Sequence, residues 1–176
     1  MKEIEVKAKV QDETALLKNI EQAGIILSQP IHQLDIVYFP KGTNPKAQFV
    51  EEALRIRNQD GKIIFTYKKP NPNNHLDKLE YETVIEDAEA MAKICEAVGF
   101  EEVIRVDKTR RKAEYQGYEI CVDHIENLGV FIEVEKLVED GDANAIQKDI
   151  FDFMQTLGVD PKDRVFKGYD LLMLNR

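Results

Sequence analysis

The sequence predicts an α+β fold, in which an eight-stranded, largely antiparallel β-sheet is interrupted by helices only at intervals. Apolar and charged residues alternate with a period of two in one run after another, as they do in strands whose two faces meet different surroundings. Many connections between these runs are short and carry turn chemistry, which favours antiparallel neighbours. A few amphipathic stretches with capping residues account for the helices.

Eight runs have the composition of strands. The pair Asp60-Gly61 between two β-rich runs indicates a hairpin, and Gly117 and Gly129 mark later turns. A sheet of this size either closes into a barrel or leaves edges that must be protected. The predicted strands are Lys2–Val10, Gln33–Phe39, Ala53–Asn58, Lys62–Lys69, Leu79–Ile85, Val103–Gln116, Tyr118–Ile125 and Val130–Val138.

Helices are predicted where a capping residue precedes an apolar stripe of helical period. Asp12 has the chemistry of an N-cap for a first helix through Ala23, which Gly24 ends. Two polar stretches, Pro40–Glu52 and Pro70–His75, have the composition of loops. The other predicted helices are Asp87–Val98, Asn144–Leu157 and a short terminal one at Gly168–Leu174.

The chain of 176 residues fits one domain, 1–176, with a core of its own. We expect no membrane partner, because no stretch approaches the roughly 20 apolar residues of a membrane span. The charged first residues lack the apolar region of a signal peptide, and Cys95 and Cys121 lack C-x-x-C spacing, so we expect a cytoplasmic protein with reduced thiols. The net charge of −9 argues against a nucleic-acid partner.

The polar faces of the predicted strands are unusually ionic. Glu3, Glu5 and Lys7 alternate with three apolar residues in the first strand, and Glu133 and Glu135 share one face of the last. Basic residues concentrate on some strands and acidic ones on others, whereas a solvated face ordinarily carries many Ser, Thr, Asn and Gln. The remaining charged positions are Arg55 and Arg57, Lys68, Glu80 and Glu82, Lys108, Arg110 and Lys112, and Asp123.

A single strand of this kind is best explained as the solvated face of a half-exposed sheet. Six such strands favour a ligand that carries both phosphate and metal. Arg and Lys from several directions would clamp a polyphosphate, and Mg²⁺ or Mn²⁺ would bind the carboxylates together with phosphate oxygens. Without a cation, converging carboxylates would repel one another and their pKa values would rise.

These charged positions, in this order, resemble the CYTH superfamily, the triphosphate tunnel metalloenzymes, over nearly the whole chain. The resemblance implies a closed eight-stranded antiparallel β-barrel, or tunnel, with a polar charged interior and helices packed outside. It also implies that a triphosphate binds there with a divalent metal. Gln33–Phe39, before a long loop, looks like the class IV adenylyl cyclase branch of the superfamily. The motifs that carry the resemblance are Glu3-x-Glu5-x-Lys7, Arg55-x-Arg57, Lys68, Glu80-x-Glu82, Lys108-x-Arg110, Asp123 and Glu133-x-Glu135.

The resemblance also implies roles for individual residues. The implied metal ligands are Glu3, Glu5, Asp123, Glu133 and Glu135. The residues that would be catalytic are Glu5, Glu135, Lys108 and Arg110, the last two by holding the triphosphate. The other residues that would bind substrate are Glu3, Lys7, Arg55, Arg57, Lys68, Glu80, Glu82, Lys112 and Tyr169. Tyr169 lies in a segment similar to a Ser-Tyr-x-Glu-Leu-Leu element of the cyclase branch, with Gly168 in place of the serine.

Three functions are open at this point. The resemblance implies an adenylyl cyclase, in which the 3′-hydroxyl of ATP attacks the α-phosphorus and gives cyclic AMP and pyrophosphate. The alternative enzyme is a triphosphatase acting on tripolyphosphate, thiamine triphosphate or a nucleotide. A non-catalytic module that binds polyphosphate or a nucleotide is the third, and the carboxylates argue against it. A homodimer is also open.

Overall fold

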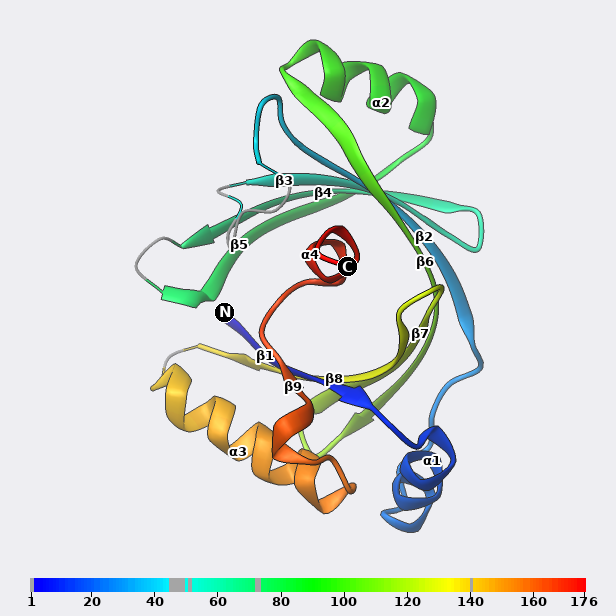
Figure 1. Cartoon of the computed structure of the whole chain (residues 1–176), viewed down its shortest axis with the longest axis vertical. Helices are drawn as coiled ribbons and strands as arrows, with labels where there is room; N and C mark the ends of the chain where they lie inside the picture. Colours follow the sequence, from blue (N-terminus) through cyan, green and yellow to red (C-terminus); the bar gives the residue numbers. More distant parts are fainter. Residues whose placement is uncertain (1, 45–49, 51, 72–73, 140) are drawn as a thin grey trace. The chain divides into compact units, whose positions relative to one another are not determined.

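The computed structural model describes residues 2–44, 50, 52–71, 74–139 and 141–176, without the side chains of residues 2, 70, 71 and 74–78. An antiparallel sheet and four α-helices confirm the α+β class (Figure 1). The strands are β1 (Lys2–Val10), β2 (Ile31–Pro40), β3 (Ala53–Gln59), β4 (Lys62–Asn71), β5 (Asn74–Ile85), β6 (Phe100–Tyr115), β7 (Tyr118–Ile125), β8 (Gly129–Val138) and β9 (Arg164–Val165). The helices are α1 (Glu13–Gln22), α2 (Ala88–Ala97), α3 (Ala143–Thr156) and α4 (Tyr169–Leu174), with a 3₁₀ turn at Pro161–Asp163.

In the part of the chain that the structure describes, the sheet has nine strands, so the predicted count of eight is wrong by one. The missed strand, β9, has only two residues and therefore no alternation to detect. The hydrogen-bonded order is β5-β4-β3-β2-β6-β7-β8-β1-β9, and every pair with a defined register is antiparallel. Over the described residues this order ends at β5 and β9, so closure into a barrel is not confirmed and stays a prediction.

The chain folds into two compact units. The first unit comprises Met1–Pro30 and Thr109–Phe166, and the second comprises Ile31–Lys108 and Lys167–Arg176. The prediction of one domain, 1–176, stays a prediction. In the described part of the chain, no helix combines the length and the apolar character that crossing a membrane requires.

In the first unit, one face of the sheet is apolar and is covered by α1 and α3. Leu16 and Ile20 of α1, and Ile150 and Met154 of α3, are buried in one cluster with alternate residues of β1, β7 and β8. Figure 1 shows α3 running alongside β1, which it contacts. Burial of each such side chain contributes roughly 1.5–3 kcal/mol. Because side chains alternate along a strand, the charged residues of the same strands lie on the other face.

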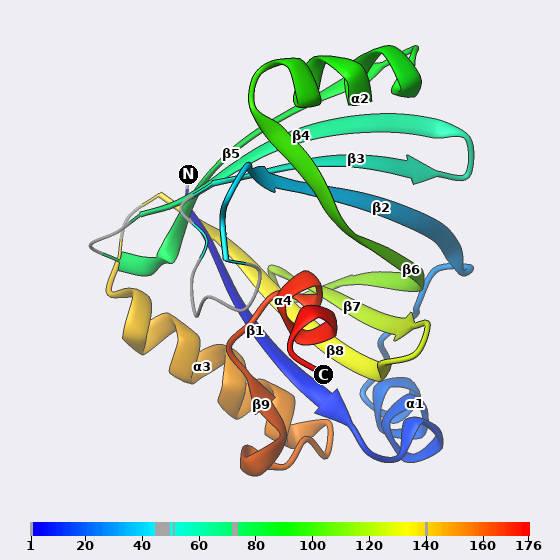
Figure 2. The ribbon, with the colours of Figure 1, turned by 45° about the horizontal axis from the view of Figure 1, so that its top comes forward.

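In the second unit, α2 and α4 pack on opposite faces of the sheet (Figure 2). Cys95 of α2 is buried in a cluster with Tyr38 and Ile56. Leu171 of α4 packs in a different cluster, with Phe39. Tyr38 and Phe39 are neighbours in β2, so their side chains point to opposite faces. The charged residues predicted for the site on β3, β4 and β5 lie on the face of the sheet that carries Phe39 and α4, as their strand register shows. They are Arg55, Arg57, Lys68, Glu80 and Glu82.

Local chemistry explains most element boundaries. The Asp12 carboxylate accepts a hydrogen bond from the Ala15 amide at 2.9 Å, as predicted for the N-cap of α1. Asp60 and Gly61 have φ values of 47° and 89°, the left-handed conformation that a two-residue hairpin turn requires. Both predictions are confirmed.

The prediction of a loop at Pro70–His75 is wrong in its extent. β4 continues to Asn71 and β5 begins at Asn74. A register shift at Pro70 and Asn71 explains the difference, since an irregular strand position tolerates a proline that cannot donate to the ladder. Much of the other predicted loop, Pro40–Glu52, lies outside the described residues.

The core of the first unit gives a test of its energetics. Replacing the buried Ile150 of α3 by Ala leaves a cavity and is expected to lower the free energy of unfolding by about 2–5 kcal/mol. The matched control is Asp149→Ala, an exposed neighbour on the same helix, which should change it by at most about 0.5 kcal/mol. Urea unfolding of both variants measures the difference, and equal effects would contradict the assignment of this core.

Candidate functional site

The charged face of the first unit is arranged in rows across β7, β8 and β1. Glu119 lies directly opposite Glu135, which lies opposite Glu5. In the next row, Glu133 lies opposite Lys7. Directly opposed residues have Cβ atoms about 4.5–5.5 Å apart. Each row therefore brings ionisable side chains of different strands within interaction range.

Among the described residues, Glu3, Glu5 and Glu135 form a carboxylate cluster, with one oxygen of each within 4.8 Å of the others. Burial raises the pKa of Glu135 to about 8, and the charges of Glu3 and Glu119 contribute in the same direction. Carboxylate oxygens are the donors that Mg²⁺ and Mn²⁺ prefer. The residues present fit the predicted cofactor, since a divalent cation would relieve this repulsion.

The other two predicted metal ligands hold buried cations. Arg110 donates from Nε to Oδ1 of Asp123 at 2.6 Å and from Nη2 to Oδ2 at 2.5 Å. Lys7 Nζ lies 3.1 Å from Glu133 Oε2. Burial alone would lower the pKa of Lys7 and of Arg110, but the carboxylates outweigh it and raise both. Asp123 and Glu133 thus neutralise predicted substrate-binding residues and are not part of the carboxylate cluster.

Lys112, the last predicted basic residue of β6, forms an ion pair with Glu119. Burial would raise the pKa of Glu119, but the hydrogen bond from Lys112 and its charge outweigh this and lower it. The sequence analysis missed Glu119. It stands two residues before Cys121 and four before Asp123, so the alternation of β7 could have placed it on the charged face.

The second unit contains a buried ion pair that the sequence analysis also missed. Asp35 on β2 lies directly opposite Arg57 on β3. Arg57 donates to the two carboxylate oxygens of Asp35 from Nε at 2.6 Å and from Nη2 at 2.8 Å. The exposed fractions are only 5% for Asp35 and 9% for Arg57. The available signal was that Asp35 is the one acidic residue of β2, a strand of mostly apolar residues.

Arg55 lies on the same face and has a hydrogen-bond donor that is unmatched among the described residues. Its Nη2 donates to Thr66 Oγ1 at 3.0 Å and lies 3.5 Å from Glu82 Oε2. Its Nε is buried without a hydrogen-bond partner in the described part of the chain. Burial lowers the pKa of Arg55, and the charge of Arg57 lowers it further. An anion would satisfy both the donor and the charge.

The remaining predicted residues of the second unit lie on the same face. Lys68 Nζ is 2.6 Å from Glu80 Oε1, so these two predicted residues neutralise each other. Lys108 Nζ lies 5.1 Å from the ring centre of Tyr169 on α4, within the range of a cation–π contact. Lys108 and Tyr169 are both buried. The structure therefore groups the predicted residues within each unit, and their roles stay predictions.

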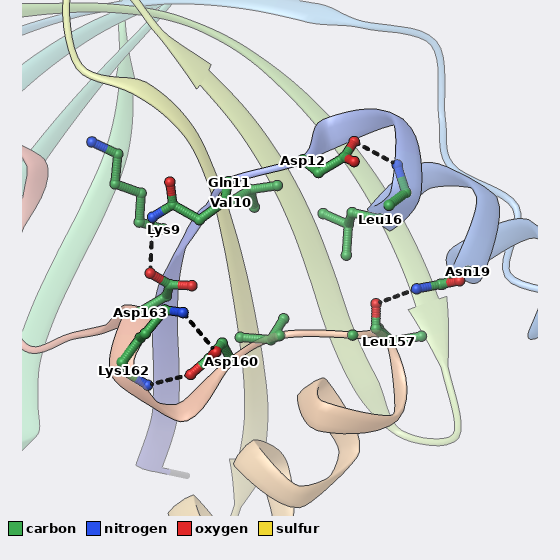
Figure 3. Close-up of a pocket in the computed structure, with 13 residues that line it drawn as sticks. Lys9, Val10, Gln11, Asp12, Leu16, Asn19, Leu157, Asp160, Lys162 and Asp163 are labelled. Atoms are coloured by element: carbon green, nitrogen blue, oxygen red, sulfur yellow. Dashed lines mark hydrogen bonds and ion pairs between the residues drawn. The ribbon is translucent and has the colours of Figure 1, made fainter.

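A pocket of about 200 Å³ lies in the first unit, at the end of β1 beside α1 and the 3₁₀ turn (Figure 3). Gln11 Nε2 donates to Asp163 Oδ1 at 2.8 Å, and Lys162 Nζ lies 2.9 Å from Asp160 Oδ2. None of the predicted site residues lines this pocket. Since these polar side chains bind one another, we interpret them as a structural link between the 3₁₀ turn and the end of β1.

Comparison with known proteins agrees with this pattern of charges. Residues 1–169 match the CYTH domain. The chain belongs to the CYTH family. The CYTH match covers all of the first unit, most of the second and every predicted site residue, the last of which is Tyr169.

Three relatives of this CYTH chain are informative. A Methanocaldococcus jannaschii protein named "Putative adenylate cyclase" is 31% identical over 175 residues, which cover 96% of this chain and 97% of that protein. A solved protein of Pyrococcus horikoshii has 30% identity and a TM-score of 0.82, with 99% of each chain covered. A Hippeastrum protein, described as a "putative adenylyl cyclase" with a dominant triphosphatase activity, has a TM-score of 0.62 over 94% of this chain and 91% of that chain. Its identity of 14% shows a similar fold alone.

The carboxylate cluster of this CYTH chain predicts a pH-dependent metal affinity. With its pKa raised to about 8, Glu135 is mostly protonated at neutral pH and must lose a proton to bind a cation. Titration calorimetry between about pH 6 and about pH 9 should show Mg²⁺ affinity rising by up to about tenfold per pH unit and levelling off above the pKa.

The same group sets the sign of a stability effect. Because the pKa of Glu135 is raised from 4.5 to about 8, the free energy of unfolding of the metal-free protein should fall as pH rises from about 4.5 to about 8, and bound metal should restore it. Glu135→Gln is the control, since it removes the titrating group. An affinity for Mg²⁺ that stays constant in the wild type from about pH 6 to about pH 8 would contradict the assignment.

Proposed function

We propose that the protein is a metal-dependent triphosphate-processing enzyme, specifically an adenylyl cyclase that converts ATP into cyclic AMP and pyrophosphate. The observation that carries the proposal is the carboxylate cluster in a CYTH chain. Carboxylates at this spacing destabilise one another unless a cation joins them. A module that only bound polyphosphate would need the basic residues and would be weakened by the cluster.

In this proposal Glu3, Glu5 and Glu135 hold Mg²⁺ or Mn²⁺. A divalent cation bound there would polarise phosphate oxygens and neutralise the charge of the leaving group. Asp123 and Glu133 were predicted as further metal ligands. In this proposal they contribute by binding the side chains of Arg110 and Lys7. They keep Arg110 and Lys7 ionised and fixed in position on the charged face.

The triphosphate is proposed to bind the basic residues Arg55, Arg57, Lys68, Lys108 and Arg110. The contacts of Arg55 are the main support, because its buried Nε and its lowered pKa both favour an added anion. Fixing the triphosphate at several points would lower the barrier chiefly through positioning and charge stabilisation. The closed tunnel implied by the resemblance belongs to this proposal as well.

The cyclase reaction needs one bond made and one broken at the α-phosphorus. The 3′ oxygen of ATP loses its proton and bonds to the α-phosphorus, while the bond to the oxygen that bridges to the β-phosphorus breaks and pyrophosphate leaves. Lys108 and Arg110 are proposed to stabilise the charge that develops on the phosphate oxygens. The name of the Methanocaldococcus jannaschii relative favours this reaction.

A triphosphatase is the second candidate, and one local feature favours it. Gly168 precedes α4 and gives the helix no side-chain cap, at the position where the cyclase element has a serine. The same basic residues and carboxylates would serve an attack of water on the terminal phosphorus. Substrate orientation alone would separate the two reactions.

Product analysis tests the proposal directly. The protein is incubated with Mg²⁺ or Mn²⁺ and, separately, with ATP, tripolyphosphate or thiamine triphosphate, and the products are resolved by phosphorus NMR. Cyclic AMP and pyrophosphate from ATP are the expected result. Orthophosphate from tripolyphosphate with ATP intact would establish the triphosphatase, and no turnover of any substrate would leave only the binding module.

Variants of the carboxylate cluster test its role in turnover. Glu5→Gln and Glu135→Gln are each expected to lower kcat by about 100-fold or more while ATP still binds, because the basic residues are unchanged. The control is Glu126→Gln, an exposed carboxylate in the turn between β7 and β8. Full activity in both cluster variants would rule out the proposed mechanism.

A further inference from the structure

We propose that Asp35 is a positioning residue for the triphosphate-binding cations, which fixes the guanidinium of Arg57 in one orientation and supplies countercharge to Lys108 and Arg55. The inference rests on the proposed function, since it concerns the same candidate site. Neither the sequence pattern nor the resemblance gave Asp35 a role.

The geometry of the pair restricts Arg57 strongly. Asp35 and Arg57 are directly opposed on neighbouring strands, and two parallel hydrogen bonds of 2.6 Å and 2.8 Å join the carboxylate to Nε and Nη2. Two such bonds fix the plane of a guanidinium as well as its position. Nη1 takes no part in these two hydrogen bonds, so its N–H groups could donate to a phosphate oxygen of a bound triphosphate.

The charge of Asp35 acts on more than one cation. Burial would raise the pKa of Asp35, but the hydrogen bonds from Arg57 and the charges of Lys108 and Arg55 outweigh it and lower the pKa to about 2. Asp35 is therefore ionised at neutral pH although it is 5% exposed. Removal of the Asp35 carboxylate would therefore take away a negative charge with which Arg57, Lys108 and Arg55 all interact.

A carboxylate cannot itself attract a triphosphate. Removing the charge of Asp35 makes the face more positive, which should leave the attraction for a polyanion unchanged or increase it. Any benefit of Asp35 to the reaction must therefore come from the orientation of its partners. A misplacement of about 1 Å in a group that positions substrate can cost about 100-fold in rate.

This reasoning separates a positioning role from a purely structural one. If Asp35 positions Arg57, the folded Asp35→Asn variant loses kcat while KM does not rise, because binding charge is retained and orientation is lost. If Asp35 only stabilises the fold, the variant unfolds more easily, since removing one partner leaves a buried cation uncompensated. In that case the molecules that remain folded turn over at the wild-type rate.

The experiment measures kcat and KM of the full chain with Mn²⁺ and whichever of ATP and tripolyphosphate the wild type turns over. For Asp35→Asn, kcat should fall about 10–100-fold, with KM unchanged or lower. Asp35→Glu keeps the charge on a longer side chain and should recover part of the loss. The matched control is Asp107→Asn, which changes a half-exposed hydrogen-bonding contact with His32 in the same unit and should leave both constants unchanged.

A folded Asp35→Asn variant with wild-type kcat, or one whose KM rises at constant kcat, overturns the inference. If Asp35→Asn does not fold, Asp35→Glu decides, because a shifted guanidinium should lower kcat, and wild-type kcat there overturns the inference equally. Failure of the proposed function has a different signature, namely no turnover by the wild type.

Discussion

The alternation of side chains along a β-strand is the constraint on which the rest of this structure depends. In β1, Ile4, Val6 and Ala8 are buried in the core that α1 and α3 cover. Glu3, Glu5 and Lys7 occupy the intervening positions and so must lie on the opposite face. The hydrophobic core thereby fixes the direction of the charged residues. A shift of register by one residue would exchange the two sets and destroy both.

A second constraint is the cost of burying charge. Lys7, Arg110, Arg57 and Lys108 are all buried, and an unpaired buried cation would be strongly destabilising. Carboxylates offset this cost in both units, through Glu133 and Asp123 in the first and Asp35 in the second. Not every charge is balanced in this way. In the proposed function, a metal bound at the carboxylate cluster and an anion bound beside the buried Nε of Arg55 would offset the charges that remain.

The sequence alone was sufficient for much of the fold and for the charged face on which the candidate site lies. Strands such as Tyr118–Ile125 were predicted to the residue, because their alternation is long and their turns contain glycine. β9 was missed because two residues carry no period, and its pairing depends on contacts that only the folded chain makes.

The sequence also could not show which predicted metal ligands would lie in the carboxylate cluster and which would bind a basic residue. Asp123 and Glu135 look alike in the sequence, since both are acidic residues at alternating positions. Their difference arises from neighbours on other strands, because Asp123 binds Arg110 and Glu135 lies beside other carboxylates. Asp35 was missed for the same reason, as its partner Arg57 is distant in sequence and adjacent only in the sheet.

The pairing of β1 has a consequence for biosynthesis. Lys2 pairs with Val138 on β8, and Lys7 pairs with Val165 on β9, so β1, which is synthesised before the other strands of this sheet, depends on partners that come much later in the sequence. Pairings this distant are slow to form and leave apolar strand residues exposed in the interval. α1 is close in sequence and can cover Ile4 and Val6 early, whereas α3 arrives only after β8. Glu5 and Glu135 therefore come together only late in synthesis, and a nascent chain that stalled before β8 would carry the basic residues of β3 without the carboxylate cluster.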